Sequence, residues 1–524
     1  MAAVTSPPVE TVAVTVDGKP HQFPKGMNLL EACQSVGAKI PFFCWHPGLS
    51  SPAVCRQCLV ELKGSPKPVP SCYTTVADQM EVTTNSPRVL DVRRQMLEFT
   101  LLNHPIDCPI CDKAGECSLQ RHYFDWDGKL ARNEGTKVRK GKVIDIGKHI
   151  VLDQERCILC TRCIRVCNEV AKSPELTMAY RGSEQILTTA PGQRLDNPYS
   201  LNTVDVCPVG ALTAKDFRFA RRAWELSATP SICPGCATGC NIEVHTSQDK
   251  IRRLVPRENP AVNKFWMCDE GRFTFHAVHE HRVLLPTVEG KRVRHDAAVA
   301  EAARMLRVAV ADNARSVGVV FSFAATNEDT HALVRLAVAG LKLERVYAGG
   351  HALGWSDDIL VSADKNPNRT GVERIVPPPL RTLKDLASDV ATGVLSTVLV
   401  LGNETLTVPA ASPVEFIVLA SHKGPLVSAA QVVLPVATWA EVDGTVTNKH
   451  GRVQRLSPAL CPPGEAQAGW NVVGRLADKL GITLGYTAAD QVFAEAARQY
   501  PFLKDAVWGP SSQPVQLRFG ESRG

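Results

Sequence analysis

Three cysteines and one histidine lie close together in residues 103–120, which read NHPIDCPICDKAGECSLQ. Cys108, Cys111 and Cys117 are spaced like ligands of one iron–sulfur site, but a cubane cluster needs four ligands and no further cysteine is near. A histidine near cysteines is usually an ordinary solvated side chain. However, His104 precedes Cys108 by four residues, and histidine replaces cysteine as an iron ligand in some clusters. The missing fourth cysteine therefore favours His104 as the fourth ligand.

Twelve further cysteines form three groups, and in chain order the stretch above is the second of four. The first group is Cys44, Cys55, Cys58 and Cys72, the third is Cys157, Cys160, Cys163 and Cys207, and the fourth is Cys233, Cys236, Cys240 and Cys268. The first spacing, C-x10-C-x2-C-x13-C, has a longer first gap than the plant-type C-x4-C-x2-C…C, which a wider loop can accommodate. It favours a [2Fe–2S] cluster, with structural zinc as the alternative.

The third and fourth groups differ in how strongly their spacing indicates iron. C-x2-C-x2-C followed by a distant Cys-Pro is the bacterial ferredoxin pattern of a [4Fe–4S] cluster. Cys167 could extend this run, but no second triplet is present for it to join, so we expect a buried thiol there. The fourth spacing, C-x2-C-x3-C-x27-C, also suits zinc, and it resembles the cluster motif at the start of molybdopterin oxidoreductases.

The elements that position the first group can be predicted from periodicity. Residues 11–23 alternate apolar and polar around an Asp-Gly pair, which predicts a hairpin. Residues 28–37 predict a short helix with Asn28 as its N-cap. Together with the irregular cysteine-containing loop of residues 41–72, this order resembles the β-grasp fold of plant-type ferredoxins.

A helix is predicted immediately before the second group, over residues 88–103. It should end near His104, because Pro105 disfavours helical geometry in the residue that precedes it. The apolar residues predicted to share its buried face are Val89, Val92, Met96 and Phe99.

Beyond Cys268 the pattern becomes alternating α/β, which favours a largely parallel sheet flanked by helices. Residues 366–383 show no core pattern and predict a loop. The predicted strands are 316–324, 396–403 and 414–421, and the predicted helices are 296–313, 329–343 and 470–481.

The bulk composition agrees with cluster binding. Of 18 cysteines in 524 residues, only Cys461 lies beyond Cys268, and dense Cys-x-x-Cys spacing in a long chain indicates metal ligation rather than disulfides. No apolar run reaches the roughly 18 residues of a membrane span. The start, MAAVTSPPVETVAVTV, lacks a secretion signal, so a cytoplasmic protein is expected.

With all four groups in place, residues 1–273 resemble the large iron–sulfur subunit (75 kDa or G type) of respiratory NADH:quinone oxidoreductase, complex I. In that family an H-x3-C-x2-C-x5-C motif holds the second cluster, and it falls on the second group, with His104 as a ligand. The first and third groups match as well, and the fourth matches a cubane that only some members retain. Residues 422–456 resemble the family's molybdopterin-type region. The resemblance implies one [2Fe–2S] cluster in the first group and one [4Fe–4S] cluster in each of the others.

The implied fold class is an α+β N-terminal half, with a β-grasp [2Fe–2S] ferredoxin-like domain and a [4Fe–4S] ferredoxin-like domain, followed by an α/β molybdopterin-oxidoreductase-like domain. The α/β half is shortened and expected to lack pterin, because its one thiol, Cys461, is poorly placed as a metal ligand. The predicted domains are 1–85 (β-grasp), 86–125 ([4Fe–4S] with one histidine and three cysteine ligands), 126–228 (ferredoxin-like [4Fe–4S]), 229–285 (molybdopterin-oxidoreductase-type [4Fe–4S]) and 286–524 (shortened α/β).

Four clusters in one chain predict an electron relay, because each exchanges single electrons. No G-x-G-x-x-G follows a strand, so no nicotinamide site or other catalytic residue is predicted. The resemblance implies that an NADH- and FMN-binding flavoprotein subunit supplies electrons, which pass the first, third and second groups to a [4Fe–4S] ferredoxin-like subunit and then quinone. The fourth group lies off that path. Other peripheral-arm subunits, an indirectly contacted proton-translocating membrane arm and the cytoplasmic side of the bacterial inner membrane are also implied.

Cluster loading changes the meaning of the formal net charge of +6. Coordinated thiols are deprotonated, so three all-cysteine clusters at about −2 each and one His-ligated cluster at about −1 would bring the total to about −1. The basic bias is therefore counter-charge for the cofactors and does not indicate nucleic-acid binding.

Two other classes of protein also fit these patterns. One is an electron-transfer subunit of a soluble NAD-linked formate dehydrogenase or hydrogenase, although a hydrogenase would need a further cysteine-rich motif downstream. The other is a zinc-stabilised scaffold without redox function. Metal analysis separates the second, because cluster binding requires about 14 irons per chain.

Overall fold

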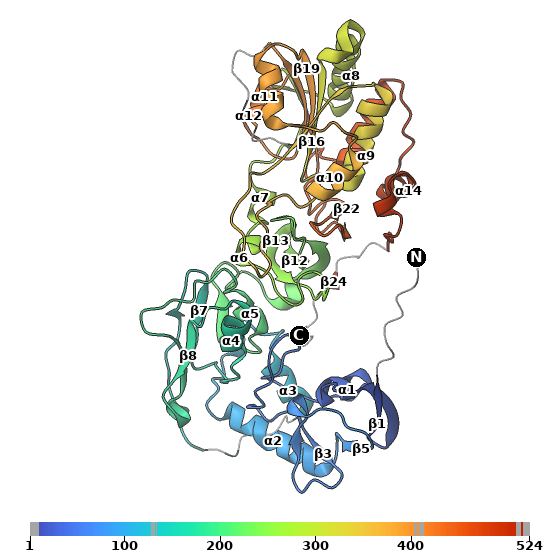
Figure 1. Ribbon diagram of the computed structural model, residues 1–524. Helices are drawn as coiled ribbons and strands as arrows, with labels where there is room; N and C mark the ends of the chain where they lie inside the picture. Colours follow the sequence, from blue (N-terminus) through green and yellow to red (C-terminus); the bar gives the residue numbers. More distant parts are fainter. Residues whose placement is uncertain are drawn as a thin grey trace. The chain divides into compact units, whose positions relative to one another are not determined.

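The computed structural model describes residues 10–126, 132, 134–402, 406–407, 413–509 and 515–516 (Figure 1). They fall into two compact units, one ending at Glu225 and the other running from Leu226 to Gln516. No helix in this described part is long and apolar enough to cross a membrane. The first nine residues, part of the start that shows no secretion signal, lie outside it, and the division into five domains stays a prediction.

The first unit opens with a five-stranded sheet in the order β2-β1-β5-β3-β4. β1 and β2 form the predicted hairpin, with Asp17 and Gly18 in its turn at φ of 48° and 79°. The predicted N-cap is confirmed, since Oδ1 of Asn28 accepts a hydrogen bond from the Leu30 amide at 3.0 Å. The elements are β1 Thr11–Val16, β2 Lys19–Pro24, α1 Leu29–Ser35, β3 Leu59–Leu62, β4 Val69–Pro70 and β5 Met80–Thr83.

Helix α2, Pro87–Leu102, ends where the sequence predicts, but its buried face differs from the predicted one. Val89, Arg93 and Leu97 are buried along one stripe of the helix. Phe99, predicted to be buried, is 67% exposed. The apolar pattern missed the true face because its central residue is an arginine.

Short elements carry the second and third groups in the rest of the first unit. A three-stranded sheet has the order β10-β7-β6, and β8 pairs with β9. The elements are η2 Cys108–Ile110, α3 Ser118–Trp126, β6 Ile144–Asp145, β7 Ile150–Leu152, α4 Arg162–Arg165, the π-helical η3 Val166–Val170, β8 Leu176–Ala179, η4 Gly182–Glu184, β9 Ile186–Thr189, α5 Asn202–Val206, β10 Leu212–Ala214 and η5 Ala223–Glu225.

The second unit begins with a small antiparallel sheet, β13-β12-β11-β24, that carries the fourth group. Cys233 directly follows β11, and Cys268 is the N-cap of the one-turn helix α6. The elements are β11 Ser227–Ile232, β12 Asn241–Ser247, β13 Lys250–Pro256, β24 Val515–Gln516, α6 Asp269–Arg272 and α7 His276–His279.

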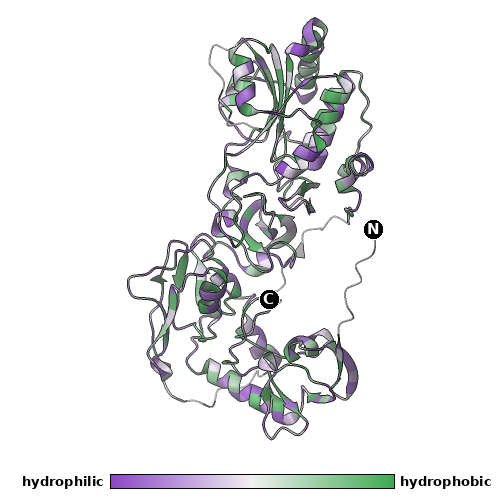
Figure 2. Cartoon of the chain, in the orientation of Figure 1, coloured by the Kyte–Doolittle hydropathy of each residue, from purple (hydrophilic) through white to green (hydrophobic). Residues whose placement is uncertain are grey.

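The larger part of the second unit is built on an eight-stranded sheet, β15-β14-β21-β20-β19-β16-β17-β18. Its pairs from β21 to β18 are all parallel, which confirms the predicted α/β architecture. Apolar side chains of β16 and β19 alternate between a core against α8, α9 and α13 and a core against α11 and α12. Figure 2 shows hydrophobic residues concentrated on these strands.

Its strands are β14 Thr287–Val288, β15 Lys291–Arg292, β16 Val317–Ser322, β17 Arg345–Gly349, β18 Arg381–Thr382, β19 Thr397–Leu401, β20 Glu415–Ala420 and β21 Val432–Pro435, and the separate hairpin is β22 Gly444–Thr447 and β23 Val453–Leu456. Its helices are α8 His295–Asn313, α9 Asn327–Leu333 with the π-helical η7 Val334–Gly340, α10 Arg369–Ile375, α11 Leu383–Ala391, α12 Pro425–Ala429, α13 Gly469–Lys479 and α14 Ala489–Gln499, with the short η6 Ala314–Ser316 and η8 Pro501–Leu503.

The loop predicted for residues 366–383 is wrong in its centre. Helix α10 lies there, and its Val372 and Ile375 are buried in the core beside α9. The helix is shorter than two full apolar repeats and is flanked by Asn and Pro residues, so its periodicity is too weak to see in the sequence.

Candidate iron–sulfur sites

The four thiols of the first group lie together beside the β-grasp sheet. The Cys44 thiol is hydrogen-bonded to those of Cys55 and Cys72. Cys72 is in turn hydrogen-bonded to Cys58. The hydrogen bonds with Cys55 and Cys72 lower the pKa of the Cys44 thiol far below its ordinary value, because they stabilise its thiolate. The pKa of Cys55 is raised, because its proton is held in the hydrogen bond with Cys44. The structure therefore brings together all four cysteines of the first group.

Local backbone geometry explains the convergence of the first group. Cys58 directly precedes β3 and Cys72 lies two residues beyond the end of β4, and the antiparallel pairing of these strands brings their ends together. The Ser71 hydroxyl fixes this end by donating to the Cys58 carbonyl at 2.8 Å. On the other side of the site, the backbone amides of Phe43 and Cys44 donate to Cys55 Sγ at 3.4 and 3.5 Å.

The second group lies between α2 and α3. The Cys111 amide donates to the Cys108 carbonyl across the turn η2, at 3.3 Å. Cys117 directly precedes α3, and its thiol interacts electrostatically with that of Cys111. Burial of Cys111 raises the pKa of its thiol, and the charge of Arg156 opposes this shift. These contacts join the three cysteines.

His104 has the properties of an uncharged iron ligand. Burial lowers the pKa of its imidazole to about 4, so the ring is neutral at physiological pH. Its Nδ1 is buried and has no hydrogen-bond partner among the described atoms. A buried ring nitrogen without a partner is costly unless something else binds it, so this observation fits a metal ligand. Its assignment as the fourth ligand stays a prediction.

The turn that carries the first three cysteines of the third group contains two residues with a left-handed backbone conformation. Leu159 and Thr161 have φ of 56° and 62°, a left-handed backbone that turns successive cysteines toward one side. Burial raises the pKa of Cys157 to about 12 and that of Cys160 to about 11, and the charges of neighbouring cysteines, including Cys207, act in the same direction. The thiols of Cys157, Cys160 and Cys207 therefore lie within electrostatic range of one another.

Three cysteines lie outside the four groups and are not predicted ligands. Cys167 is fully buried, as predicted, and burial raises its pKa to about 12. Cys33 is packed in the core of the β-grasp sheet, and Cys461 is exposed. All 18 thiols are free of disulfides, as expected for ligands and buried thiols.

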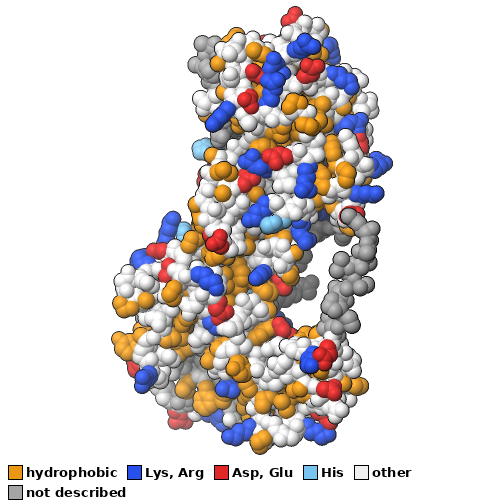
Figure 3. All heavy atoms as spheres, viewed as in Figure 1, with side chains coloured by type: hydrophobic (Ala, Val, Ile, Leu, Met, Phe, Trp, Pro, Cys, Tyr) orange, Lys and Arg blue, Asp and Glu red, His pale blue; other side chains and the backbone are white. Residues whose placement is uncertain are grey.

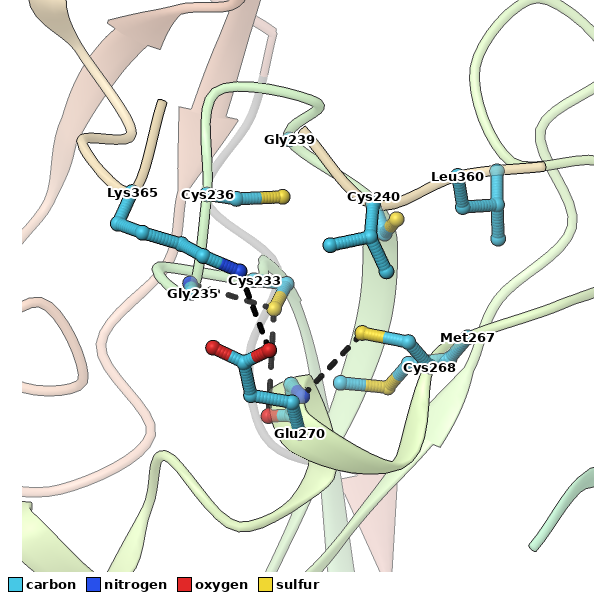
Figure 4. Close-up of a pocket in the computed structure, with 12 residues that line it drawn as sticks. Cys233, Gly235, Cys236, Gly239, Cys240, Met267, Cys268, Glu270, Leu360 and Lys365 are labelled. Carbon is cyan, nitrogen blue, oxygen red and sulfur yellow. Dashed lines mark hydrogen bonds and ion pairs between the residues drawn. The ribbon is translucent and has the colours of Figure 1, made fainter. Parts of the chain in front are cut away.

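The fourth group lines a cavity in the second unit, and Figure 4 shows its four sulfur atoms facing one common space. The amides of Gly235 and Gly271 donate to Cys233 Sγ and Cys268 Sγ at 3.5 and 3.3 Å. A Cβ on Gly271 would lie 3.0 Å from Cys233 Sγ and 3.3 Å from Cys268 Sγ. Glycine therefore leaves the space beside two of the thiols open.

The two charged residues that line this cavity, Glu270 and Lys365, were not predicted. Lys365 lines it, and its Nζ lies 3.1 Å from Glu270 Oε2 and 5.2 Å from the centre of the Trp355 ring. No sequence signal marked it, because it belongs to an irregular segment far along the chain from the last cysteine of the group.

The second and third groups contact each other directly. A Cβ built on Gly210, in the segment that follows Cys207, would lie 2.2 Å from Cys111 Sγ. Next to this contact, the Ser118 amide donates to the Pro208 carbonyl at 2.9 Å. The first and second groups also approach each other, since the rings of Phe43 and His122 lie 4.7 Å apart.

The donor sets fit iron–sulfur clusters. In the described part of the chain, no three or more His, Cys, Asp or Glu side chains are arranged to hold a single metal ion. The ligands of an iron–sulfur cluster bind different irons of one core. Thiols gathered at four places, glycines that keep space beside them and a neutral imidazole with a buried, unbonded nitrogen match that requirement.

The stretch EVDGTVTNKHGRVQR, residues 441–455 within the region that resembles the molybdopterin type, contains all but the last residue of the buried hairpin β22–β23. The Thr445 amide donates to Glu328 Oε2 at 2.7 Å, and the Thr447 amide donates to Asn368 Oδ1 at 2.6 Å. Burial raises the pKa of Glu328 to about 8, so it is protonated at neutral pH. The packing function of this stretch is therefore observed directly.

Comparison with known protein families divides the chain in the same order. Five family models match: a 2Fe-2S iron-sulfur cluster binding domain at residues 9–87, an NADH-ubiquinone oxidoreductase-G iron-sulfur binding region at 93–126, the ferredoxin-like domain of NADH-quinone oxidoreductase subunit 3 at 147–213, a molybdopterin oxidoreductase Fe4S4 domain at 226–280 and molybdopterin oxidoreductase at 295–479. The chain thus contains 2Fe–2S and 4Fe–4S binding domains followed by a molybdopterin-oxidoreductase domain, which confirms the predicted fold class.

Curated relatives match about half of the chain. The mitochondrial NADH dehydrogenase [ubiquinone] iron-sulfur protein 1 of Solanum tuberosum is 40% identical over 292 residues, which are 55% of this chain and 39% of the relative. The NADH-ubiquinone oxidoreductase 75 kDa subunit of Reclinomonas americana is 41% identical over 278 residues, 53% of this chain and 40% of the relative. The chain therefore matches only about two fifths of these relatives' length.

A solved chain of an NAD+-reducing [NiFe]-hydrogenase is 29% identical and covers 40% of this chain and 91% of its own, but its TM-score of 0.37 supports no conclusion. The relatives and the family models together confirm the predicted resemblance. Over about half of its length, this chain is similar to the NADH-ubiquinone oxidoreductase 75 kDa subunit and to related iron–sulfur subunits.

Proposed function

We propose that the chain is an iron–sulfur electron-relay subunit of an NADH:quinone oxidoreductase. The observation that carries this proposal is that candidate ligands gather at four places, in the same order as the matched cluster-binding domains. When bound, iron–sulfur clusters accept and donate single electrons. The chain's own residues bind them, exclude water from them and set the charge around them.

The proposed ligand sets follow the four groups. A [2Fe–2S] cluster is bound by Cys44, Cys55, Cys58 and Cys72, and [4Fe–4S] clusters are bound by His104, Cys108, Cys111 and Cys117, by Cys157, Cys160, Cys163 and Cys207, and by Cys233, Cys236, Cys240 and Cys268. The thiols become thiolates on binding, whereas His104 binds through a neutral nitrogen and leaves its site less negative.

The resemblance implies the order first, third, second group, and both contacts that this order requires are present. The third group touches the second through Gly210 and Cys111. It touches the first through Arg165, which donates to carbonyls of Cys44 and Cys160. The fourth group belongs to the other compact unit, and its proposed position off the path rests on the resemblance.

The proposed partners are an NADH- and FMN-binding flavoprotein subunit, a [4Fe–4S] ferredoxin-like subunit on the quinone side and other peripheral-arm subunits of a proton-translocating complex. The proposed location is the cytoplasmic side of the bacterial inner membrane. Figure 3 shows Lys and Arg interspersed with Asp and Glu on the visible face of the described residues, which suits protein partners better than nucleic acid. The α/β domain is proposed to act as a scaffold without pterin.

The test is metal and spin analysis of the anaerobically purified chain. We expect about 14 irons per chain and paramagnetic signals from one binuclear and three cubane sites on reduction. Cys55→Ser should remove about two irons and Cys160→Ser about four, whereas Cys461→Ser should remove none. Colourless protein, or zinc in place of iron, would contradict the proposal.

Co-purifying subunits test the rest of the proposal. Membrane subunits together with a flavoprotein would support a quinone-reducing complex. A soluble hydrogenase or formate dehydrogenase catalytic subunit in their place would overturn that assignment and leave the relay intact.

A further inference from the structure

Two arginines lie within the ligand turn of the third group, in CILCTRCIR. Arg162 and Arg165 begin and end the one-turn helix α4, so their side chains share one face of it. Both are buried, with 6% and 8% of their surface exposed. Arginine is rarely buried to this extent unless something nearby balances its charge.

The hydrogen bonds of both guanidinium groups run to two different cysteine groups. Arg162 donates to the Val206 carbonyl, beside the third group, at 3.0 Å and to the Trp45 carbonyl, beside the first. Arg165 donates to the carbonyls of Cys44 and Cys160, the latter at 3.5 Å. Each arginine therefore connects a ligand segment of the first group with one of the third.

A further contact holds the same two segments together. Arg165 also donates to the Ser50 carbonyl, in the loop that follows Cys44. The Glu169 carboxylate, one turn after Arg165, accepts from the Ser50 amide at 2.9 Å and from its hydroxyl at 2.5 Å. The loop of the first group is thus fastened to the helix of the third at several points.

The charges of the two arginines match the charge of loaded sites. In the described part of the chain, neither guanidinium lies within ion-pair distance of a carboxylate, and the acceptors named above are neutral carbonyls. The Glu169 carboxylate acts on Arg165 only from beyond that distance. Both act electrostatically on the thiols of Cys44 and Cys160. Buried cations are costly unless paired, and coordination turns these thiols into thiolates, so loaded sites supply the missing anions.

We infer that Arg162 and Arg165 form a shared cationic bridge that sets the reduction potentials of the first and third sites together. A fixed positive charge favours the more negative, reduced form of a cluster, and net charge and hydrogen bonding are known controls of its potential. Because one guanidinium serves both groups, one substitution shifts both sites. This inference rests on the proposed function, since it requires both sites to bind clusters.

The test is a redox titration of both sites, followed by paramagnetic resonance, in the full-length chain. Arg165→Gln removes the charge and keeps a hydrogen-bond donor, so both midpoint potentials should shift to lower values. Arg165→Lys keeps the charge, so both potentials should return toward those of the unmodified chain.

Arg93 offers a matched control. It is also a buried arginine, and it donates to the Leu59 carbonyl at 2.6 Å, next to Cys58 of the first group only. Its charge acts on Cys58 and on no thiol of the third group. Arg93→Gln should therefore lower the potential of the first site and leave that of the third unchanged.

The outcomes separate the inference from the proposed function. Full iron content with both potentials unchanged in Arg165→Gln would overturn the bridge and leave the relay in place. If Arg165→Gln fails to load clusters, Arg165→Lys provides the test. Unchanged midpoint potentials in Arg165→Lys would support the bridge, and a fall in both potentials despite the retained charge would overturn it. Absence of clusters from the unmodified chain would instead contradict the proposed function.

Discussion

Gly210 follows the last cysteine of the third group by three residues and leaves room for a sulfur atom of the second. A Cβ at this position would lie 2.2 Å from Cys111 Sγ, closer than real atoms approach, and 3.2 Å from the Lys113 side chain. Cys111 Sγ, a proposed cluster ligand, would have to move to make room for it. The absence of a side chain at Gly210 is therefore a requirement of the second site, although the residue belongs to the third.

Gly210→Ala is predicted to prevent loading of the second site. We expect a loss of about four irons per chain and of one cubane signal, measured by iron analysis and paramagnetic resonance. Gly474→Ala is the matched control, because a Cβ there meets nothing within 4 Å and alanine is favoured in a helix such as α13. A Gly210→Ala protein with full iron content and all its signals would show that the close contact is relieved at no cost.

Single residues also mark the limit of what the sequence could predict. The cysteines were found because ligand spacing is local information that survives in the chain. Gly210, Arg162 and Lys365 were not, because their functions depend on segments that meet only after folding. His104 falls between these cases: its position in the motif suggested it, and its buried, unpartnered nitrogen supports it.

At the scale of elements, helix α2 shows why an apolar pattern can find a helix and misplace its face. Its boundaries follow from local signals, namely the Ser86 N-cap at one end and the proline after its last turn at the other. Its orientation depends on what it packs against. Arg93 is buried because the Leu59 carbonyl accepts its hydrogen bonds, and a hydrophobicity pattern cannot detect such a partner.

The two candidate faces of α2 can be separated by a pair of truncations. Leu97→Ala should destabilise the helix by about 2–5 kcal/mol, because a fully buried side chain leaves a cavity. Phe99→Ala should change stability by less than about 0.5 kcal/mol, because Phe99 is exposed in this chain. Hydrogen exchange of the α2 amides measures both effects locally. A larger loss of protection in Phe99→Ala than in Leu97→Ala would favour the face predicted from the sequence.

Across the whole molecule, folding and cofactor charge are coupled. The amino acids alone carry a formal net charge of +6, and two of the cations, Arg162 and Arg165, are buried beside the cysteine groups. Such a distribution suits clusters with a combined charge of about −7. The sequence could predict this balance because it depends on counts, whereas the placement of each cation required the fold.

Isoelectric focusing under anaerobic conditions tests that balance. The loaded chain should focus well below the same chain after its clusters have been removed, since the formal net charge changes from +6 to about −1. Cys160→Ser, which should lose the third cluster, is expected to focus above the loaded unmodified chain by an amount that reflects about two charges. Cys167→Ser is the control, because this buried thiol is not a proposed ligand, and it should focus with the unmodified chain. If loaded and cluster-free protein focused together, the basic residues would not be counter-charges for the clusters, and the positive charge of the chain would need another explanation.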